Sequence, residues 1–272
     1  MLARQPAAPL RPFVKVLWAT EPGDAAARVA RRERVLPTGA IHVAFLFGEP
    51  LRLFRDEDDR EGGVVGRSVV GGARATYYLK DVSRPSPSVG VQLQPGAAEI
   101  VLGVPAGEIG GRHTLLEGLW GSAAAEALER LVDAPSAAGR LIALEAILLA
   151  RLPRVRGVHP AVAEALARFA AAPDVPVGDV VQATGYSHRR FVTLFRDSVG
   201  LTPKAYARVL RFQSAIARLA ARPAPRAIEV ALDAGYSDQP HLNRDFREFA
   251  GISPERYRRA QPDSSNHVPI FD

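Results

Sequence analysis

The sequence contains no cysteine, which excludes disulfides, thiolate metal sites and thiol nucleophiles and removes any need for an oxidising compartment. It also lacks a long apolar run, because the longest one, residues 141–152, contains Glu145 and is too short to cross a bilayer. The first residues, broken by prolines at 6, 9 and 12, are a poor match to a signal peptide. We therefore expect a cytoplasmic protein with no cofactor and no metal.

The composition is that of an ordinary globular protein, with 47% hydrophobic and 24% charged residues, and a length of 272 residues favours two domains. The net charge of +6 favours a polyanionic partner. Most of this excess positive charge lies in residues 160–261, which contain fifteen Arg and Lys and ten Asp and Glu.

The patterning predicts a multidomain α+β protein. Strand-like runs divided by Gly and Pro fill the chain from about residue 13 to 120, at 35–47, 51–54, 68–70, 75–79 and 89–93. Two helices are expected next, at 122–133 and 136–152, each beginning at a serine suited to N-capping. After the proline-bounded connector 153–160, every segment is patterned as a helix. The predicted units are a β-rich sensor-like domain with two C-terminal helices (1–155), an all-α domain (156–262) and a flexible tail (263–272).

The all-α part contains an internal repeat. GYSHRRFVTLFR at 185–196 is echoed by GYSDQPHLNRDFR at 235–247, with one extra residue in the second copy, and both copies continue into Gly-Leu/Ile-Thr/Ser-Pro. In each copy a short helix is followed by glycine, which tolerates a left-handed turn, and then by a second helix with one apolar face. This spacing is that of a helix-turn-helix, in which the first copy has Ser187 as the expected cap.

A long helix is predicted between the copies, at 203–221, with Thr202 and Pro203 at its start and Pro223 and Pro225 beyond its end. Its length of roughly 28 Å is close to the spacing of about 34 Å between successive major grooves. One chain could therefore place both second helices in adjacent grooves.

The outer faces of the two second helices carry groups suited to nucleic acid. Arg and amide side chains can pair with guanine and adenine edges, and apolar groups can press on a thymine methyl. The predicted base-reading residues are Arg189, Val192 and Thr193 in the first copy and Gln239, Asn243 and Arg244 in the second. The predicted phosphate contacts are Arg190, Arg196 and Arg247, and we expect the second helix to read more sequence.

These motifs, together with Phe-Arg-x-Phe-x-Gly-Ile-Ser-Pro and Tyr-Arg in the second copy, closely resemble the C-terminal DNA-binding domain of AraC/XylS-type bacterial transcription regulators over about 160–260. The resemblance implies a non-enzymatic, sequence-specific transcription factor that binds double-stranded DNA. It also allows a small-molecule effector, a homodimer and a contact with RNA polymerase. Departures from the family pattern include Pro240 in the first turn of the second reading helix and Asp245, an anion expected near the DNA side.

The N-terminal half gives weaker signals. The resemblance implies a sensing or dimerising domain there, and four aromatic residues are candidates for a ligand pocket, although core packing is the favoured interpretation for each: Trp18, Tyr77, Tyr78 and Trp120. His42 is interpreted as a satisfied strand histidine. His113 and Glu117 have i, i+4 spacing, but no third ligand accompanies them.

Two other functions remain open from the sequence alone. An architectural protein would bind DNA without sequence preference, and the cluster of Gln239, Asn243 and Arg244 would then be incidental. An enzyme with an attached DNA-binding domain is the other alternative, but no paired acidic or nucleophilic constellation supports it.

Overall fold

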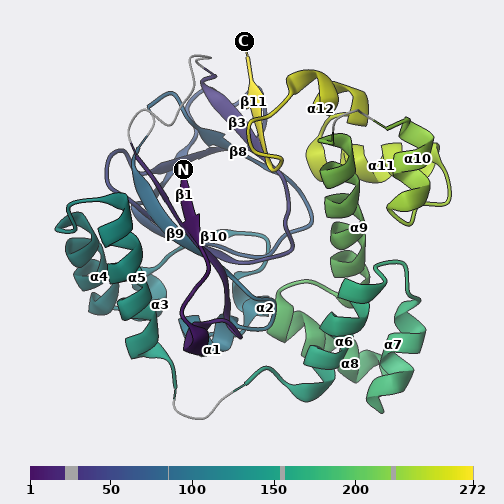
Figure 1. Ribbon diagram of the computed structural model, residues 1–272, viewed down its shortest axis with the longest axis horizontal. Helices are drawn as coiled ribbons and strands as arrows, with labels where there is room; N and C mark the ends of the chain where they lie inside the picture. The colour runs from purple at the N-terminus through teal and green to yellow at the C-terminus, as the bar shows by residue number, and fades with distance from the viewer. Residues whose placement is uncertain (22–29, 85, 154–156, 222–224, 272) are drawn as a thin grey trace.

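The computed structural model describes residues 1–21, 30–84, 86–153, 157–221 and 225–271 (Figure 1). It contains a β-rich N-terminal part with two sheets, which is followed by an all-helical part, as the sequence predicted. The expected boundary at residue 155 lies outside the described residues. No helix in the described part of the chain is long and apolar enough to span a membrane.

The first sheet has six antiparallel strands in the order β1-β2-β9-β4-β7-β10. One face is apolar, with Val43, Phe45 and Val91 fully buried, and packs on the N-terminal helices. Its strands are β1 (Leu2–Arg4), β2 (Val14–Thr20), β4 (His42–Leu46), β7 (Ser68–Gly71), β9 (Ser88–Leu93) and β10 (His113–Leu115).

The second sheet has five strands in the order β11-β3-β8-β5-β6. The predicted strand 35–47 is divided between the sheets: Val35 ends β3, Gly39 adopts a left-handed φ of 71°, and β4 then begins. The strands of this sheet are β3 (Arg32–Val35), β5 (Leu51–Phe54), β6 (Gly63–Gly66), β8 (Tyr78–Asp81) and β11 (His267–Ile270).

The prediction of a flexible tail at 263–272 is wrong. Strand β11 pairs antiparallel with β3, and the backbone N–H of Leu36 donates to the carbonyl of Asn266 at 2.8 Å. Val268 is 1% exposed and packs with Leu36 and the core of the second helix-turn-helix. The tail is ordered because this one apolar side chain is buried and the edge of β3 supplies hydrogen-bond partners.

Among the described residues, six helical segments accompany the sheets: η1 (Ala8–Leu10), α1 (Ala98–Leu102), α2 (Ala106–Ile109), α3 (Glu117–Trp120), α4 (Ser122–Val132) and α5 (Ala137–Arg151). Helices α4 and α5 match the two predicted helices and cover the apolar face of the first sheet (Figure 1). Ser136 caps α5 by accepting from the N–H of Gly139, whereas Ser122 is already inside α4 and makes no cap. Helices α1 and α2 were not expected.

The C-terminal part consists of α6 (Pro160–Ala171), α7 (Val177–Thr184), α8 (His188–Val199), α9 (Pro203–Leu219), α10 (Ala227–Asp233), α11 (Gln239–Ala250) and α12 (Pro254–Ala260). Helix α9 joins two apolar cores. Tyr206 and Ala207 pack with α6, α7 and α8, while Phe212 and Ile216 pack with α10, α11 and α12. Pro223, one of the prolines expected to end α9, lies outside the described residues.

Candidate nucleic-acid interface

The first helix-turn-helix consists of α7 and α8. Helix α7 ends at Gly185, whose φ of 72° is left-handed, and α8 follows after Ser187. Ser187 occupies the N-cap position, but its side chain makes no capping hydrogen bond. Phe191 and Phe195 are fully buried, so the opposite face of α8 is directed to solvent. On that face Arg189 and Thr193 are exposed and Val192 is half-buried.

The second helix-turn-helix consists of α10 and α11. Asp238 takes the N-cap position, which is that of Ser187 in the first copy, and its carboxylate accepts from the backbone N–H of His241 at 2.6 Å. Pro240 is accommodated in the first turn, where its missing N–H costs little. Gln239 and Arg244 are exposed and Asn243 is half-buried. Both copies therefore present the predicted base-reading residues on one outer face.

The predicted phosphate contacts are also at the surface, with Arg190, Arg196 and Arg247 all exposed. Arg196 lies 3.7 Å from the carboxylate of Asp197. Within the described part of the chain, Arg189, Arg190, Arg244 and Arg247 form no ion pair. Arginines that are solvated and unpaired on two adjacent helices are suited to the phosphates of a polyanion.

Asp245 does not lie on the DNA side, contrary to expectation. It is 3% exposed, and its carboxylate accepts from the guanidinium of Arg208 in α9 at 2.7 Å. The same guanidinium donates to Glu248 at 2.6 Å and lies 4.8 Å from the ring centre of Phe249. The hydrogen bond to Glu248, and then that to Asp245, raise the pKa of Arg208. This network fixes α11 on the long helix.

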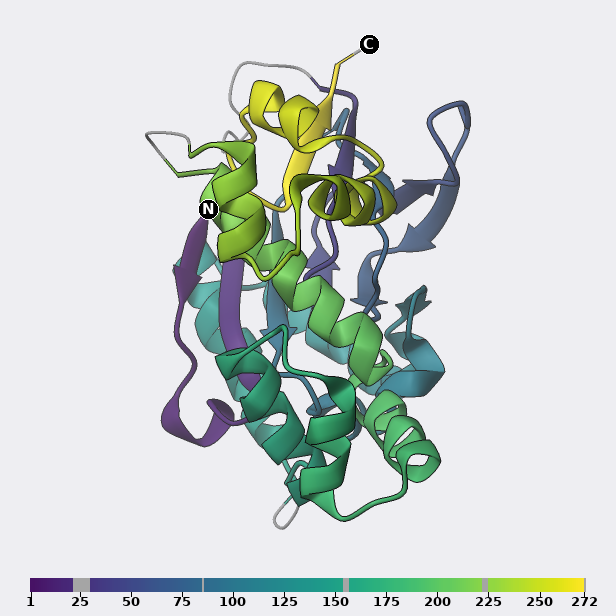
Figure 2. The same cartoon turned by 90° about the vertical axis from the view of Figure 1, so that its right-hand side faces the viewer.

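Helix α9 separates the two motifs. Its 17 residues correspond to about 26 Å of rise, against about 34 Å between successive major grooves. Figure 2 shows α8 and α11 on the same side of the molecule, with α9 running between the two motifs. The arrangement suits two adjacent grooves on one side of a duplex.

The four aromatic residues proposed for a ligand pocket do not come together. Trp120 is buried, and the guanidinium of Arg151 lies 4.0 Å from its ring centre. Trp18 lies against Gly90 within the first sheet, and Tyr77 packs on Gly251 at the end of α11.

Tyr78 belongs instead to a cluster that the sequence did not reveal. The Tyr78 ring meets that of His113 at 4.5 Å, and a guanidinium nitrogen of Arg74 lies 3.1 Å from Nδ1 of His113. His42 and His113 flank Gly71 from the two neighbouring strands. These residues are far apart in the sequence, so no spacing could have indicated the cluster.

Burial keeps the two histidines neutral. It lowers the pKa of His42 to about 4, helped by the charges of His267, Lys15 and Arg74. It also lowers the pKa of His113 to about 3, with the charge of Arg74 as the next cause. His113 and Glu117 do not form the i, i+4 pair, because His113 lies in β10 and Glu117 begins α3. Among the described residues no group of three potential metal ligands is found.

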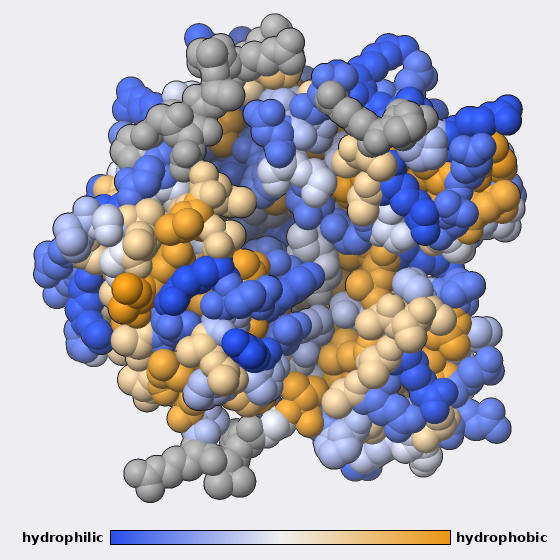
Figure 3. Space-filling model, viewed as in Figure 1, coloured by the Kyte–Doolittle hydropathy of each residue, from blue (hydrophilic) through white to orange (hydrophobic). Residues whose placement is uncertain are grey.

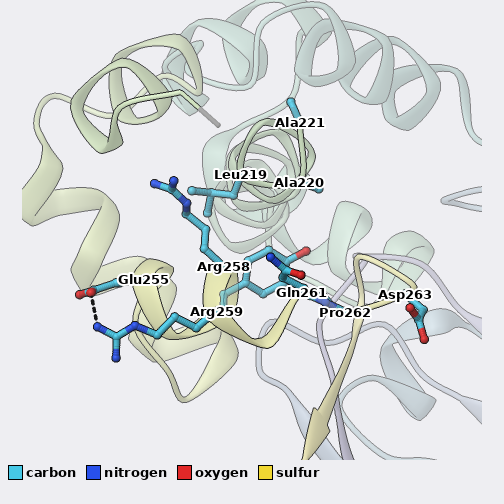
Figure 4. Close-up of a pocket in the computed structure, with 10 residues that line it drawn as sticks. Leu219, Ala220, Ala221, Glu255, Arg258, Arg259, Gln261, Pro262 and Asp263 are labelled. Carbon is cyan, nitrogen blue, oxygen red and sulfur yellow. Dashed lines mark hydrogen bonds and ion pairs between the residues drawn. The ribbon is translucent and has the colours of Figure 1, made fainter. Parts of the chain in front are cut away.

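One pocket, of about 710 Å³, lies between the end of α9, α12 and the turn into β11 (Figure 4). Its lining residues come from these three segments: Leu219, Ala220, Ala221, Glu255, Tyr257, Arg258, Arg259, Gln261, Pro262 and Asp263. It contains none of the predicted site residues.

Comparison with known proteins supports the assignment of helix-turn-helix motifs to the C-terminal part of the chain. Residues 163–260 match the family described as "Helix-turn-helix domain", and residues 3–114 match a domain of unknown function (DUF6597). The putative HTH-type transcriptional regulator YkgA of Escherichia coli K12 is 32% identical over 98 residues, and the regulator MtrA of Neisseria gonorrhoeae is 29% identical over 83. These matches cover 36% and 30% of this chain but only 41% and 27% of the relatives.

The fold is similar to that of apo ToxT K231A from Vibrio cholerae, with a TM-score of 0.50 at 11% identity, over 95% of this chain and 100% of that one. The chain therefore combines a two-sheet part with a pair of helix-turn-helix motifs on a shared helix, and the latter part matches the helix-turn-helix family. The helix-turn-helix domain of this chain is of the AraC/XylS type, which confirms the resemblance found in the sequence.

Proposed function

We propose that this protein is a sequence-specific DNA-binding transcription regulator that acts in the cytoplasm and has no catalytic activity. The observation that supports this best is the pair of outward faces on α8 and α11, which are joined by the uninterrupted helix α9. An architectural protein would not need amide and guanidinium groups gathered at the start of one reading helix.

The two faces have different roles in this proposal. Gln239 and Asn243 pair with adenine and Arg244 with guanine, each worth about 1–3 kcal/mol of discrimination. Arg189, Val192 and Thr193 provide a more apolar surface that contacts thymine methyl groups or a guanine. The phosphates are held by Arg190, Arg196 and Arg247.

Selection of binding sites from a random DNA pool tests the proposal. We expect an enriched sequence that is bound about 10³-fold or more tightly than a scrambled duplex at fixed salt, with Arg244→Ala reducing the ratio. Without enrichment, and with affinity that only decays as salt rises, the architectural alternative would be favoured.

The N-terminal part, residues 1–155, is proposed to sense a small molecule. The support is the cluster of Arg74, Tyr78, His42 and His113, a group of half-buried polar side chains that form no ion pair with one another or with a carboxylate of the described residues. A screen of metabolites by thermal unfolding, followed by DNA affinity with each hit, tests this role. If no compound changes both the unfolding temperature and the affinity for DNA, the domain is only a scaffold.

A homodimer through α5 is the proposed oligomer. Ile142 and Leu149 are 62% and 37% exposed on its outer face, and Val132 at the end of α4 is 54% exposed. Figure 3 shows apolar surface on the side of the molecule where α4 and α5 lie. Sedimentation should show a dimer that Ile142→Asp dissociates, while Val64→Asp, at another exposed valine, leaves it intact.

A contact with RNA polymerase is assigned to the outer face of α10. Ile228 and Leu232 are 39% and 57% exposed there, beside the acidic Glu229 and Asp233. In transcription with purified components, Leu232→Ala should lower activation at the selected site while DNA affinity stays unchanged. Equal activation by both proteins would remove this assignment.

A further inference from the structure

The segment that follows β7 and includes the first residue of β8, residues 72–78, contacts both copies of the repeat. Gly200 and Gly251 are equivalent positions in the two copies, and each ends its reading helix in a left-handed conformation, with φ of 88° and 68°. Residues 73 and 77 touch these two glycines. A single stretch of the N-terminal domain therefore holds the ends of both reading helices.

In the contact with the first copy, the backbone at Gly200 lies close to Ala73 and Gly110. A Cβ placed on Gly200 would lie 3.1 Å from Cβ of Ala73, and one on Gly110 would lie 2.7 Å from the carbonyl oxygen of Gly200. Gly72 is in turn packed under α2, where a Cβ would lie 1.8 Å from the carbonyl oxygen of Ile109. Ala73 and α2 thus form one tight surface against the end of α8, so a displacement of this surface would also displace the end of that helix.

The contact with the second copy involves Tyr77. Its backbone N–H donates to the carbonyl of Phe249 at 2.9 Å. Its ring lies directly on Gly251, where a Cβ would come within 2.6 Å of the ring. A shift of the backbone at residue 77 would therefore displace the end of α11.

Arg74 lies between these two contacts and is the only part of the segment with a charge. Its guanidinium is 4.6 Å from the ring centre of Tyr78 and donates to Nδ1 of His113, which is a neutral acceptor. No carboxylate of the described chain pairs with it, and Glu33, whose charge acts on Tyr78, is bound by Lys80 at 3.5 Å and by His267. A partly desolvated guanidinium without an anion is unfavourable and is suited to a bidentate oxyanion.

We propose that Arg74 binds an oxyanion, a carboxylate or a phosphate, of a small molecule, and that this occupancy alters the hold of residues 72–78 on both reading helices. The inference rests on the proposed regulatory function and specifies the ligand class and the route of its signal. An anion bound to the guanidinium competes with Nδ1 of His113 for its hydrogen bond. It also pulls the guanidinium away from its contact with the ring of Tyr78. Because Ala73 is adjacent to Arg74 and Tyr77 is three residues away, the resulting backbone shift reaches both glycines together.

Binding is tested with sodium acetate and sodium phosphate, each against sodium chloride at equal ionic strength, by calorimetry and by the histidine ring signals in NMR spectra. Wild type should show saturable binding of at least one probe, and the stronger of the two identifies the oxyanion. Arg74→Gln should abolish it and Arg74→Lys should retain a weaker form. Arg112→Gln, an exposed arginine on the neighbouring loop, should bind like wild type. Failure of both probes, or equal binding by Arg74→Gln, overturns the site.

Coupling is tested by measuring affinity for the selected DNA site with and without saturating probe at constant ionic strength. We expect a change of about tenfold in wild type, none in Arg74→Gln, and a smaller change in Tyr77→Ala, which should still bind the probe. Tyr77→Phe keeps the ring on Gly251 and should retain the full change. Unaltered DNA affinity in a probe-bound wild type overturns the coupling. Because site selection is performed without probe, failure of the regulatory function itself would be detected separately.

Discussion

The two helix-turn-helix motifs have nearly the same sequence but are fixed to the rest of the molecule in different ways. The first is held at Gly200 by close backbone packing against α2 and Ala73. The second is also contacted at its glycine, by Tyr77 on Gly251, but it has two further anchors: Arg208 on Asp245 and Glu248, and the C-terminal strand β11. The repeat therefore encodes the local motif, whereas contacts that differ between the copies determine how each one is anchored.

The largest expected effect comes from removing the polar anchor of the second copy. Arg208→Ala leaves the carboxylate of Asp245, which is 3% exposed, without its cation. We expect the free energy of unfolding to fall by about 3 kcal/mol, measured by urea denaturation, and the protection of α11 against hydrogen exchange to fall more than that of α8.

A matched control is Arg218→Ala, which breaks the salt bridge between Arg218 and Asp233. The two side chains of this bridge are 42% and 59% exposed. Such a surface pair should contribute less than about 1 kcal/mol. Equal losses in the two variants would show that the Arg208 network is not the anchor of α11.

The next effect concerns recognition. Arg244→Ala should reduce discrimination at one base pair of the selected site by about 2 kcal/mol, because the guanidinium is exposed and free of ion pairs to described residues. Arg189→Ala in the first copy should weaken binding to all sequences more evenly. Affinities for a set of single-base variants measure both. A larger loss of base preference in Arg189→Ala would reverse the assignment of reading roles.

A smaller effect is expected at β11. Val268→Ala removes two methyl groups from a side chain that is 1% exposed in the core of the second copy. We expect a loss of roughly 1.5 kcal/mol, with increased hydrogen exchange in β3 and α11 and little change in α8. Val64→Ala, at 55% exposure, is the control and should remain within about 0.5 kcal/mol. If α8 loosens as much as α11, the strand does not anchor the second copy selectively.

The sequence predicted the motifs well because their determinants are local. Gly185, the buried Phe191 and Phe195 and the long helix between the copies all follow from spacing and turn chemistry. The orientation of Asp245 could not be predicted, because its partner Arg208 is 37 residues away in the sequence. A charged residue in a helix is ordinarily interpreted as solvated, and only the packing of α9 on α11 reverses this.

The missed parts depend on contacts between distant segments. Gly72 and Gly110 have the sequence character of turn residues, but their function in the fold is to allow close backbone approach to α2 and Gly200. The polar residues 263–266 indicated a loose tail, so β11 was not predicted. This strand forms because it pairs with the edge of β3. Likewise, Arg74 and His113 became a candidate site only when β7 and β10 were paired.

The smallest difference between the copies lies at the caps of their reading helices, and it offers the most direct local comparison. Asp238 accepts from the N–H of His241, whereas Ser187 makes no capping bond from its side chain. Asp238→Ala should therefore cost about 1 kcal/mol, and Ser187→Ala clearly less, in urea unfolding. Similar losses would mean that Ser187 does cap α8 in solution. Because Ser187 and Asp238 are equivalent N-cap positions, the unequal result would show that the carboxylate stabilises the start of its helix more than the serine hydroxyl does.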